Sequence, residues 1–138
     1  MVESDATVEA WRRVRALTQG PEALAPANAV AERAGITPTL ARALVALTAD
    51  RPTSMRELAG ALRCDASYVT AVVDGLEQHG LARRTAHPTD RRIKVVELTA
   101  EGAALAGRLQ AALDVAPEAL RALSPTDLQA LLRVLRKT

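Results

Sequence analysis

The chain has 138 residues, which suffices for one domain with a sizeable core but is too short for a second, catalytic domain beside it. Apolar residues make up 49% and charged residues 25% of the chain, a composition that excludes a disordered protein and, being rich in alanine and leucine, favours helix. The net charge is only +2, so a function that requires positive charge must depend on where the basic residues lie.

Cysteine usage and the start of the chain indicate the compartment. Cys64 is the only cysteine, which excludes an intrachain disulfide, leaves intermolecular pairing open and fits a reducing environment. The acidic start lacks the apolar segment of an export signal, and no run of about 18 apolar residues could span a bilayer. We therefore expect a cytoplasmic protein without a membrane segment.

The first third of the chain predicts three helices. Residues 5–18 carry apolar side chains near 3.6 spacing, and the Gly-Pro pair at 20–21 then interrupts the helix. A second helical piece is expected over about 21–34. Thr37 is placed to cap a third helix, whose leucine stripe faces the core.

Two further helices follow at close spacing. Ser54 and Glu57 form the pattern of a capping box, which predicts a short helix over about 54–63. Asp65 can cap the next helix, expected over about 66–79.

After Gly80 the period of the apolar residues changes. Short runs over 81–86 and 93–98 bound the turn sequence HPTDRR, and the β-branched residues of the second run favour strand. The pattern predicts a two-stranded hairpin. Thr99 is placed to cap a long helix through about 113, and a proline-started final helix follows Ser124.

Helix, short break, helix and hairpin is the order of a winged helix-turn-helix. The stretches MRELAGALRCDASYVTAVVDGLEQHGLARR and DRRIKVVELTAEG resemble the MarR family of transcriptional regulators over about 35–102. The resemblance implies a homodimer built from the terminal helices, about 5–34 and 103–137, and a pseudo-palindromic double-stranded DNA operator. It also implies release or modulation by a small-molecule effector or an oxidant. The whole chain, 1–138, is then a single mainly helical domain with one small hairpin.

The helix over 66–79 would be the one that enters the major groove. Its N-terminus favours anions, and the short polar side chains of its first turns can reach base edges or phosphates. Tyr68 could equally pack its ring on the domain. Asp74 and Glu77 would repel phosphates and so mark the end of the DNA-facing stripe. The residues predicted to contact DNA on this helix are Ser67, Tyr68, Thr70 and Ala71.

The hairpin carries a cluster of basic residues. Arg92 is expected to enter the minor groove, because a narrow minor groove concentrates negative potential. Asp90 is expected to hold an arginine in position. Arg84, Arg91 and Lys94 would contact the flanking phosphates.

Catalytic and metal sites are not expected. The chain shows no nucleophile with a neighbouring base, no phosphate-cradling glycine loop and no ligand pair with zinc spacing, so neither an enzyme nor a cofactor is predicted. Trp11 is the one aromatic candidate for the wall of an effector pocket, and packing in a dimer core is the interpretation that we favour for it. Ala71 and Gly75 stand where family members often carry basic residues. A winged-helix module that binds a protein instead of DNA is therefore the alternative function.

Overall fold

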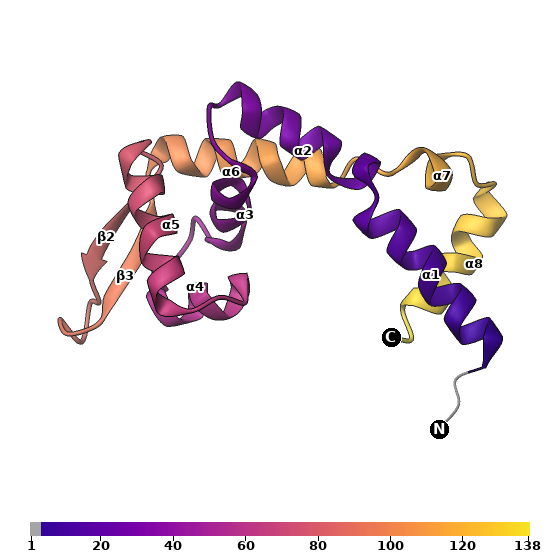
Figure 1. Ribbon diagram of the computed structural model, residues 1–138, viewed down its shortest axis with the longest axis horizontal. Helices are drawn as coiled ribbons and strands as arrows, with labels where there is room; N and C mark the ends of the chain where they lie inside the picture. Colours follow the sequence, from indigo (N-terminus) through magenta and orange to yellow (C-terminus); the bar gives the residue numbers. More distant parts are fainter. Residues whose placement is uncertain (1–3) are drawn as a thin grey trace. The chain divides into compact units, whose positions relative to one another are not determined.

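The computed structural model describes residues 4–138. The first three residues, which belong to the acidic start considered above, lie outside the described part. The helices and strands follow one another in this order, and Figure 1 labels all of them except β1: α1 (Asp5–Gln19), α2 (Pro21–Arg33), α3 (Pro38–Ala46), β1 (Thr53–Ser54), α4 (Met55–Leu62), α5 (Ala66–Gln78), β2 (Ala82–Ala86), β3 (Lys94–Leu98), α6 (Ala100–Leu113), α7 (Glu118–Arg121) and α8 (Pro125–Leu135).

The chain divides into two compact units. Ala27–Ala112 forms one, the central unit, which contains the winged region predicted over about 35–102. The other, the terminal unit, consists of the chain up to Pro26 together with Leu113–Thr138.

Side-chain caps start the helices where the sequence predicted them. Thr37, Asp65 and Ser124 each accept a hydrogen bond from a backbone N–H of the helix that follows. The capping box of α4 is complete, with Ser54 and Glu57 each accepting from the other's backbone N–H. That backbone donor from Ser54 is the main reason why the pKa of Glu57 lies below its ordinary value of 4.5.

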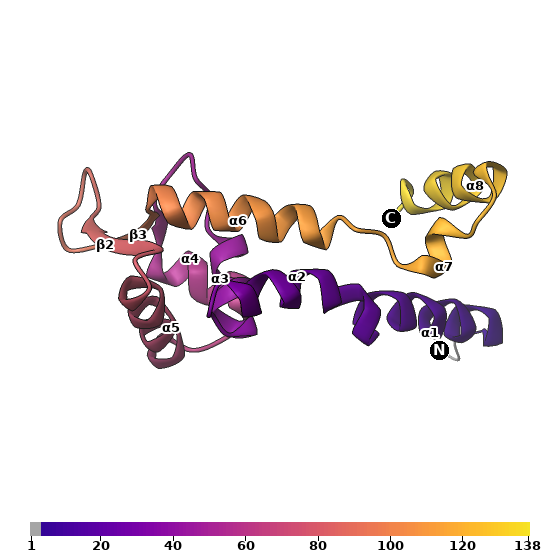
Figure 2. The ribbon, with the colours of Figure 1, turned by 90° about the horizontal axis from the view of Figure 1, so that it is seen from above.

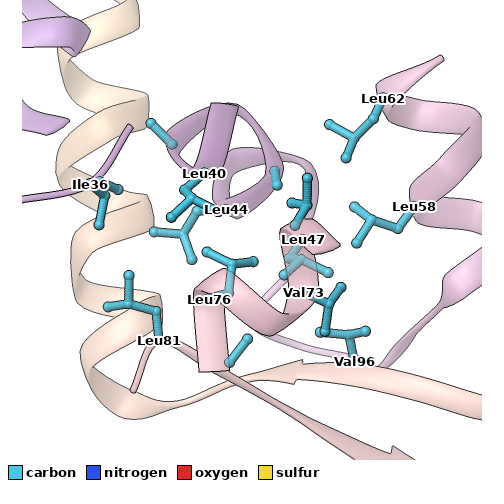
Figure 3. Packing of buried hydrophobic residues seen from close by; sticks show 14 of the residues in the cluster. Ile36, Leu40, Leu44, Leu47, Leu58, Leu62, Val73, Leu76, Leu81 and Val96 are labelled. Atoms are coloured by element: carbon cyan, nitrogen blue, oxygen red, sulfur yellow. The ribbon is translucent and has the colours of Figure 1, made fainter. Parts of the chain in front are cut away.

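The core of the central unit lies where α3, α4 and α5 meet the sheet and α6. Figure 3 shows the leucines of α3 and α4 gathered against Val73 and Leu76 of α5 and Val96 of β3. Leu44, Leu58 and Leu76 are fully buried. Because the buried residues recur at helical spacing on each helix, one face of each is committed to this core and the other is left to solvent.

The sheet has one strand more than predicted. A two-stranded hairpin was expected, but β1 also pairs with β3, so the order is β1-β3-β2. Thr53 lies opposite Val96 and Ser54 opposite Val95. The prediction missed β1 because two residues are too short for an alternating pattern. β2 and β3 run side by side, and the loop between them extends away from the helices in both Figure 1 and Figure 2.

The N-terminus of α6 is joined tightly to the turn that follows α5. Thr99 Oγ1 donates to the carbonyl of Gly80 at 2.6 Å and accepts from Gly102 N–H at 3.0 Å. Thr99 N–H donates to the carbonyl of Leu81 at 3.1 Å. A Cβ on Gly102 would lie 1.8 Å from that carbonyl oxygen, so only glycine permits this approach.

The terminal unit builds no core of its own from α1, α7 and α8, since none of their residues is buried. The short α7 was not predicted, because four residues after a proline show no period. Large apolar side chains of this unit are exposed instead, which is unusual for a stable single chain. They are Trp11, Val14, Leu24, Leu113, Val115, Leu123, Leu132, Val134 and Leu135.

Candidate nucleic-acid interface

The second helix of the pair, α5, presents one face to the core and the other to solvent. Val69 and Leu76 are among its buried side chains. Asp65 begins the helix by accepting a hydrogen bond from Tyr68 N–H at 2.8 Å, so the first turn keeps its free backbone N–H groups at the surface. The residues that the sequence predicted as DNA contacts all lie exposed here: Ser67, Tyr68, Thr70 and Ala71.

Two of these residues have features that the sequence did not reveal. The side chain of Tyr68 is 48% exposed, so its ring is not enclosed by the domain. The hydroxyl of Thr70 donates to the carbonyl of Ala66 at 2.9 Å, which leaves its oxygen as an acceptor toward solvent. A Cβ on Gly75 would lie 2.9 Å from Leu40 Cδ2, so position 75 faces α3 rather than the exposed stripe.

The loop between β2 and β3, which we call the wing tip (residues 87–93), is a hydrogen-bonded turn. His87 N–H donates to the carbonyl of Ile93 at 2.9 Å, and Ile93 N–H donates to the carbonyl of Asp90 at 3.1 Å. Arg91 and Arg92 are therefore the central residues of a β-turn. Asp90 Oδ1 also accepts from Arg92 N–H at 3.0 Å, so the carboxylate holds Arg92 by its backbone and not by its guanidinium.

Three basic side chains of the wing point to solvent without a protein partner. Arg91, Arg92 and Lys94 are exposed. None of their side chains forms an ion pair or hydrogen bond with another residue of the described range, 4–138. Positive charge that is not neutralised within the protein is available to an anionic partner.

Arg84 has a different environment from the wing-tip arginines. Its guanidinium pairs with Glu77 at 2.5 Å and with Asp74, and it donates to the carbonyl of Thr70 at 3.2 Å. Its side chain is 28% exposed. Arg84 was predicted to contact a flanking phosphate. Its guanidinium extends from β2 to α5 and lies between the carboxylates of Asp74 and Glu77.

Arg56 joins this surface although the sequence analysis did not single it out. A hollow of about 660 Å³ lies among α4, α5 and the hairpin. Arg56 lines it from α4, together with Thr70 and Lys94. Its signal in the sequence is weak, because one arginine in a capping-box helix is usually a solvated charge.

One histidine and the cysteine of the central unit are engaged within the fold. His79 places Nδ1 2.8 Å from the carbonyl of Gly75 and Nε2 3.2 Å from that of Gly35. Cys64 is partly buried against the core. Residues 4–138 contain no group of three or more histidine, cysteine or acidic side chains that could hold a metal ion. No helix within the same range is both long and apolar enough to cross a membrane.

The terminal unit contains an apolar hollow of about 280 Å³. Trp11 is 57% exposed on α1 and is not among the residues that line this hollow. The lining comes from the residues around the α1–α2 junction, from the last residue of α6 and from the segment that follows it: Leu17, Thr18, Ala23, Leu24, Leu113, Val115, Pro117 and Leu120.

The helix pair α4–α5 followed by the β2–β3 hairpin, with β1 completing the sheet, defines a winged helix-turn-helix protein. A sequence model described as the MarR family matches residues 36–94. Together with the structural similarities below, this match shows that the chain belongs to the MarR family. Its members are transcriptional regulators that usually bind DNA and are generally not enzymes.

Solved structures extend the similarity over nearly the whole chain. Apo MarR from E. coli has a TM-score of 0.74 at 21% identity, covering 99% of this chain and 98% of that one. CouR from Rhodococcus jostii RHA1, bound to p-coumaroyl-CoA, has a TM-score of 0.67 at 27% identity, with 96% and 90% covered. A probable transcriptional regulator from Pseudomonas aeruginosa has a TM-score of 0.57 at 31% identity, with 83% and 89% covered. No curated protein sequence gives a significant match.

Proposed function

We propose that this chain is an effector-responsive repressor that binds a pseudo-palindromic double-stranded DNA operator as a homodimer. One observation carries the DNA-binding part: the exposed first turns of α5 and the unpartnered cations of the wing belong to one compact unit. Arg91, Arg92 and Lys94 are charged groups with no partner in the described chain, as the binding of phosphates requires.

The two elements have separate roles in this proposal. The α5 helix enters the major groove, where Ser67, Thr70 and the Tyr68 hydroxyl reach base edges or phosphates and Ala71 offers an apolar contact. The wing tip approaches the minor groove with Arg92, while Lys94, Arg91 and the newly found Arg56 contact phosphates. The phosphate contact first expected of Arg84 is not part of the proposal, because its guanidinium already serves two carboxylates.

The terminal unit supports the homodimer. Its helices α1, α7 and α8 leave their apolar faces uncovered within one chain, and a second copy offers an identical set to cover them. A two-fold dimer would set two α5 helices about one DNA turn apart, roughly 34 Å, which requires a pseudo-palindromic site. Trp11 is assigned here to the dimer contact.

The proposed effector is a small molecule with an apolar portion. CouR is bound to p-coumaroyl-CoA, an organic thioester. The hollow of the terminal unit is lined by leucine, valine, alanine and proline with one threonine, which fits an apolar portion of a small molecule. An effector seated there would alter the terminal helices and so the spacing of the two α5 helices.

The experiment that tests the proposal measures binding of the purified protein to duplex fragments from the region upstream of its own gene. Coding-region duplexes of the same length serve as the control. We expect tighter binding to an upstream fragment and an affinity that falls steeply between 50 and 200 mM salt, because phosphate contacts release counterions. Equal or absent binding to every duplex would instead favour the protein-interaction module.

A further inference from the structure

The α5 helix carries two carboxylates close to the residues proposed to contact DNA. Asp74 lies one helical turn after Thr70, and Glu77 follows three residues later. Uncompensated carboxylates beside a phosphate backbone would oppose binding. The proposed function therefore requires something that neutralises them.

Arg84 on β2 supplies that compensation. Its Nη1 donates to Glu77 Oε1 at 2.5 Å, and its Nη2 donates both to Asp74 and to the carbonyl of Thr70, the latter at 3.2 Å. Its backbone N–H donates to the second oxygen of Glu77 at 3.2 Å. One residue thus binds three residues of α5 through side chain and main chain together.

The neighbouring Arg83 does not share the contacts that Arg84 makes with α5. Side chains alternate along a strand, so Arg83 points to the other face of the hairpin. There it pairs with Glu97, its cross-strand partner on β3, at 3.2 Å. Its side chain is 67% exposed, against 28% for Arg84. Arg83 therefore bridges two strands of the wing, whereas Arg84 bridges the wing and α5.

We infer that Arg84 is a positioning residue, not a DNA contact: it neutralises Asp74 and Glu77 and fixes β2 against α5. The α5 helix and the wing then approach DNA in a fixed relative orientation. The inference rests on the proposed DNA-binding function. Arginine suits this role because its planar guanidinium donates hydrogen bonds to several acceptors at once, whereas a lysine ammonium would act as a single point charge.

The test is a cycle of four proteins: wild type, Arg84→Gln, the double variant Asp74→Asn/Glu77→Gln, and the variant with all three changes. Glutamine keeps an extended side chain, and each variant is first checked for folding by circular dichroism. The probe is a duplex selected from a random pool with the wild-type protein, with a scrambled duplex of equal length beside it. Arg83→Gln is the matched control, because it removes an arginine of the same strand that does not touch α5.

We expect Arg84→Gln to lower duplex affinity by about tenfold, since loss of one partner leaves two unpaired carboxylates. The triple variant, which lacks those carboxylates as well, should recover most of the affinity that Arg84→Gln loses. The double variant Asp74→Asn/Glu77→Gln, which keeps Arg84, should gain much less affinity over wild type. Amide exchange at residue 84 in the DNA-free protein should accelerate in Arg84→Gln and stay unchanged in Arg83→Gln.

Two outcomes overturn the inference, and they are distinguishable. If the gain from removing the carboxylates is the same with and without Arg84, the effects are additive, and Arg84 acts independently of them as a direct contact. If wild type binds no member of the duplex pool, the proposed function itself fails and the inference fails with it.

Discussion

Gly102 shows how a single residue sets the junction between α6 and the winged region. A Cβ at this position would lie 1.8 Å from the carbonyl oxygen of Leu81, a backbone atom that Thr99 N–H also binds. We expect Gly102→Ala to lower the free energy of unfolding by about 3 kcal/mol, because the backbone itself must move to admit the methyl group. Chemical denaturation of wild type and variant measures this difference.

Gly107 provides the control on the same helix. A Cβ there meets nothing within 4 Å. Gly107→Ala should therefore raise the free energy of unfolding by roughly 0.5–1 kcal/mol, the usual gain in helix propensity. A Gly102→Ala protein as stable as Gly107→Ala would show that α6 is not seated on Leu81 as described.

At the scale of the element, the wing combines two kinds of basic residue with different expected effects on DNA binding. Arg92 is a central residue of the turn that Asp90 organises, whereas Lys94 begins β3. Arg92→Ala should cost about 1–3 kcal/mol at a specific duplex and soften the preference for the base pairs under the wing. Lys94→Ala should weaken binding to all duplexes alike and lower the salt slope by about one.

Competition assays with base-pair variants of the selected duplex separate these two effects. Asp90→Ala should mimic a milder loss of Arg92, because it removes the acceptor of Arg92 N–H and leaves the guanidinium intact. If folded Arg92→Ala protein keeps wild-type affinity and selectivity, the wing tip is a solvated basic loop and takes no part in recognition.

At the scale of the whole molecule, the proposed homodimer depends on the exposed apolar side chains of the terminal unit. Leu128, Leu131, Leu132 and Leu135 form a stripe along α8, and none of them is buried in one chain. We expect sedimentation to show a dimer at micromolar concentration. Leu132→Glu should weaken the dimer at least about tenfold, because it places a charge in the apolar contact.

Gln129→Glu is the matched control, since it adds the same charge to α8 at an exposed polar position. It should leave the sedimentation coefficient unchanged. A wild-type monomer at micromolar concentration that still binds a two-fold duplex would contradict the dimer.

Most of the local structure could be predicted from the sequence because it depends on residues within one helical turn. Ser54 and Glu57 lie three residues apart, and their mutual hydrogen bonds begin α4 as predicted. Asp65 likewise caps α5, and Gly80 adopts the left-handed conformation that ends it. The order of these elements predicted the winged helix-turn-helix, and the resemblance of the stretch to the MarR family is confirmed by the family model that matches residues 36–94.

Only the tertiary structure decided which charges remain free. Arg84 and Arg92 look alike in the sequence, yet the guanidinium of Arg84 pairs with Asp74 and Glu77 across the fold, while the guanidinium of Arg92 pairs with no residue of the described range. The two-residue strand β1 is likewise defined by its partner on β3, more than 40 residues along the chain. Such pairings depend on how helix and strand pack in space, and a one-dimensional pattern contains no distance between residues that are far apart in sequence.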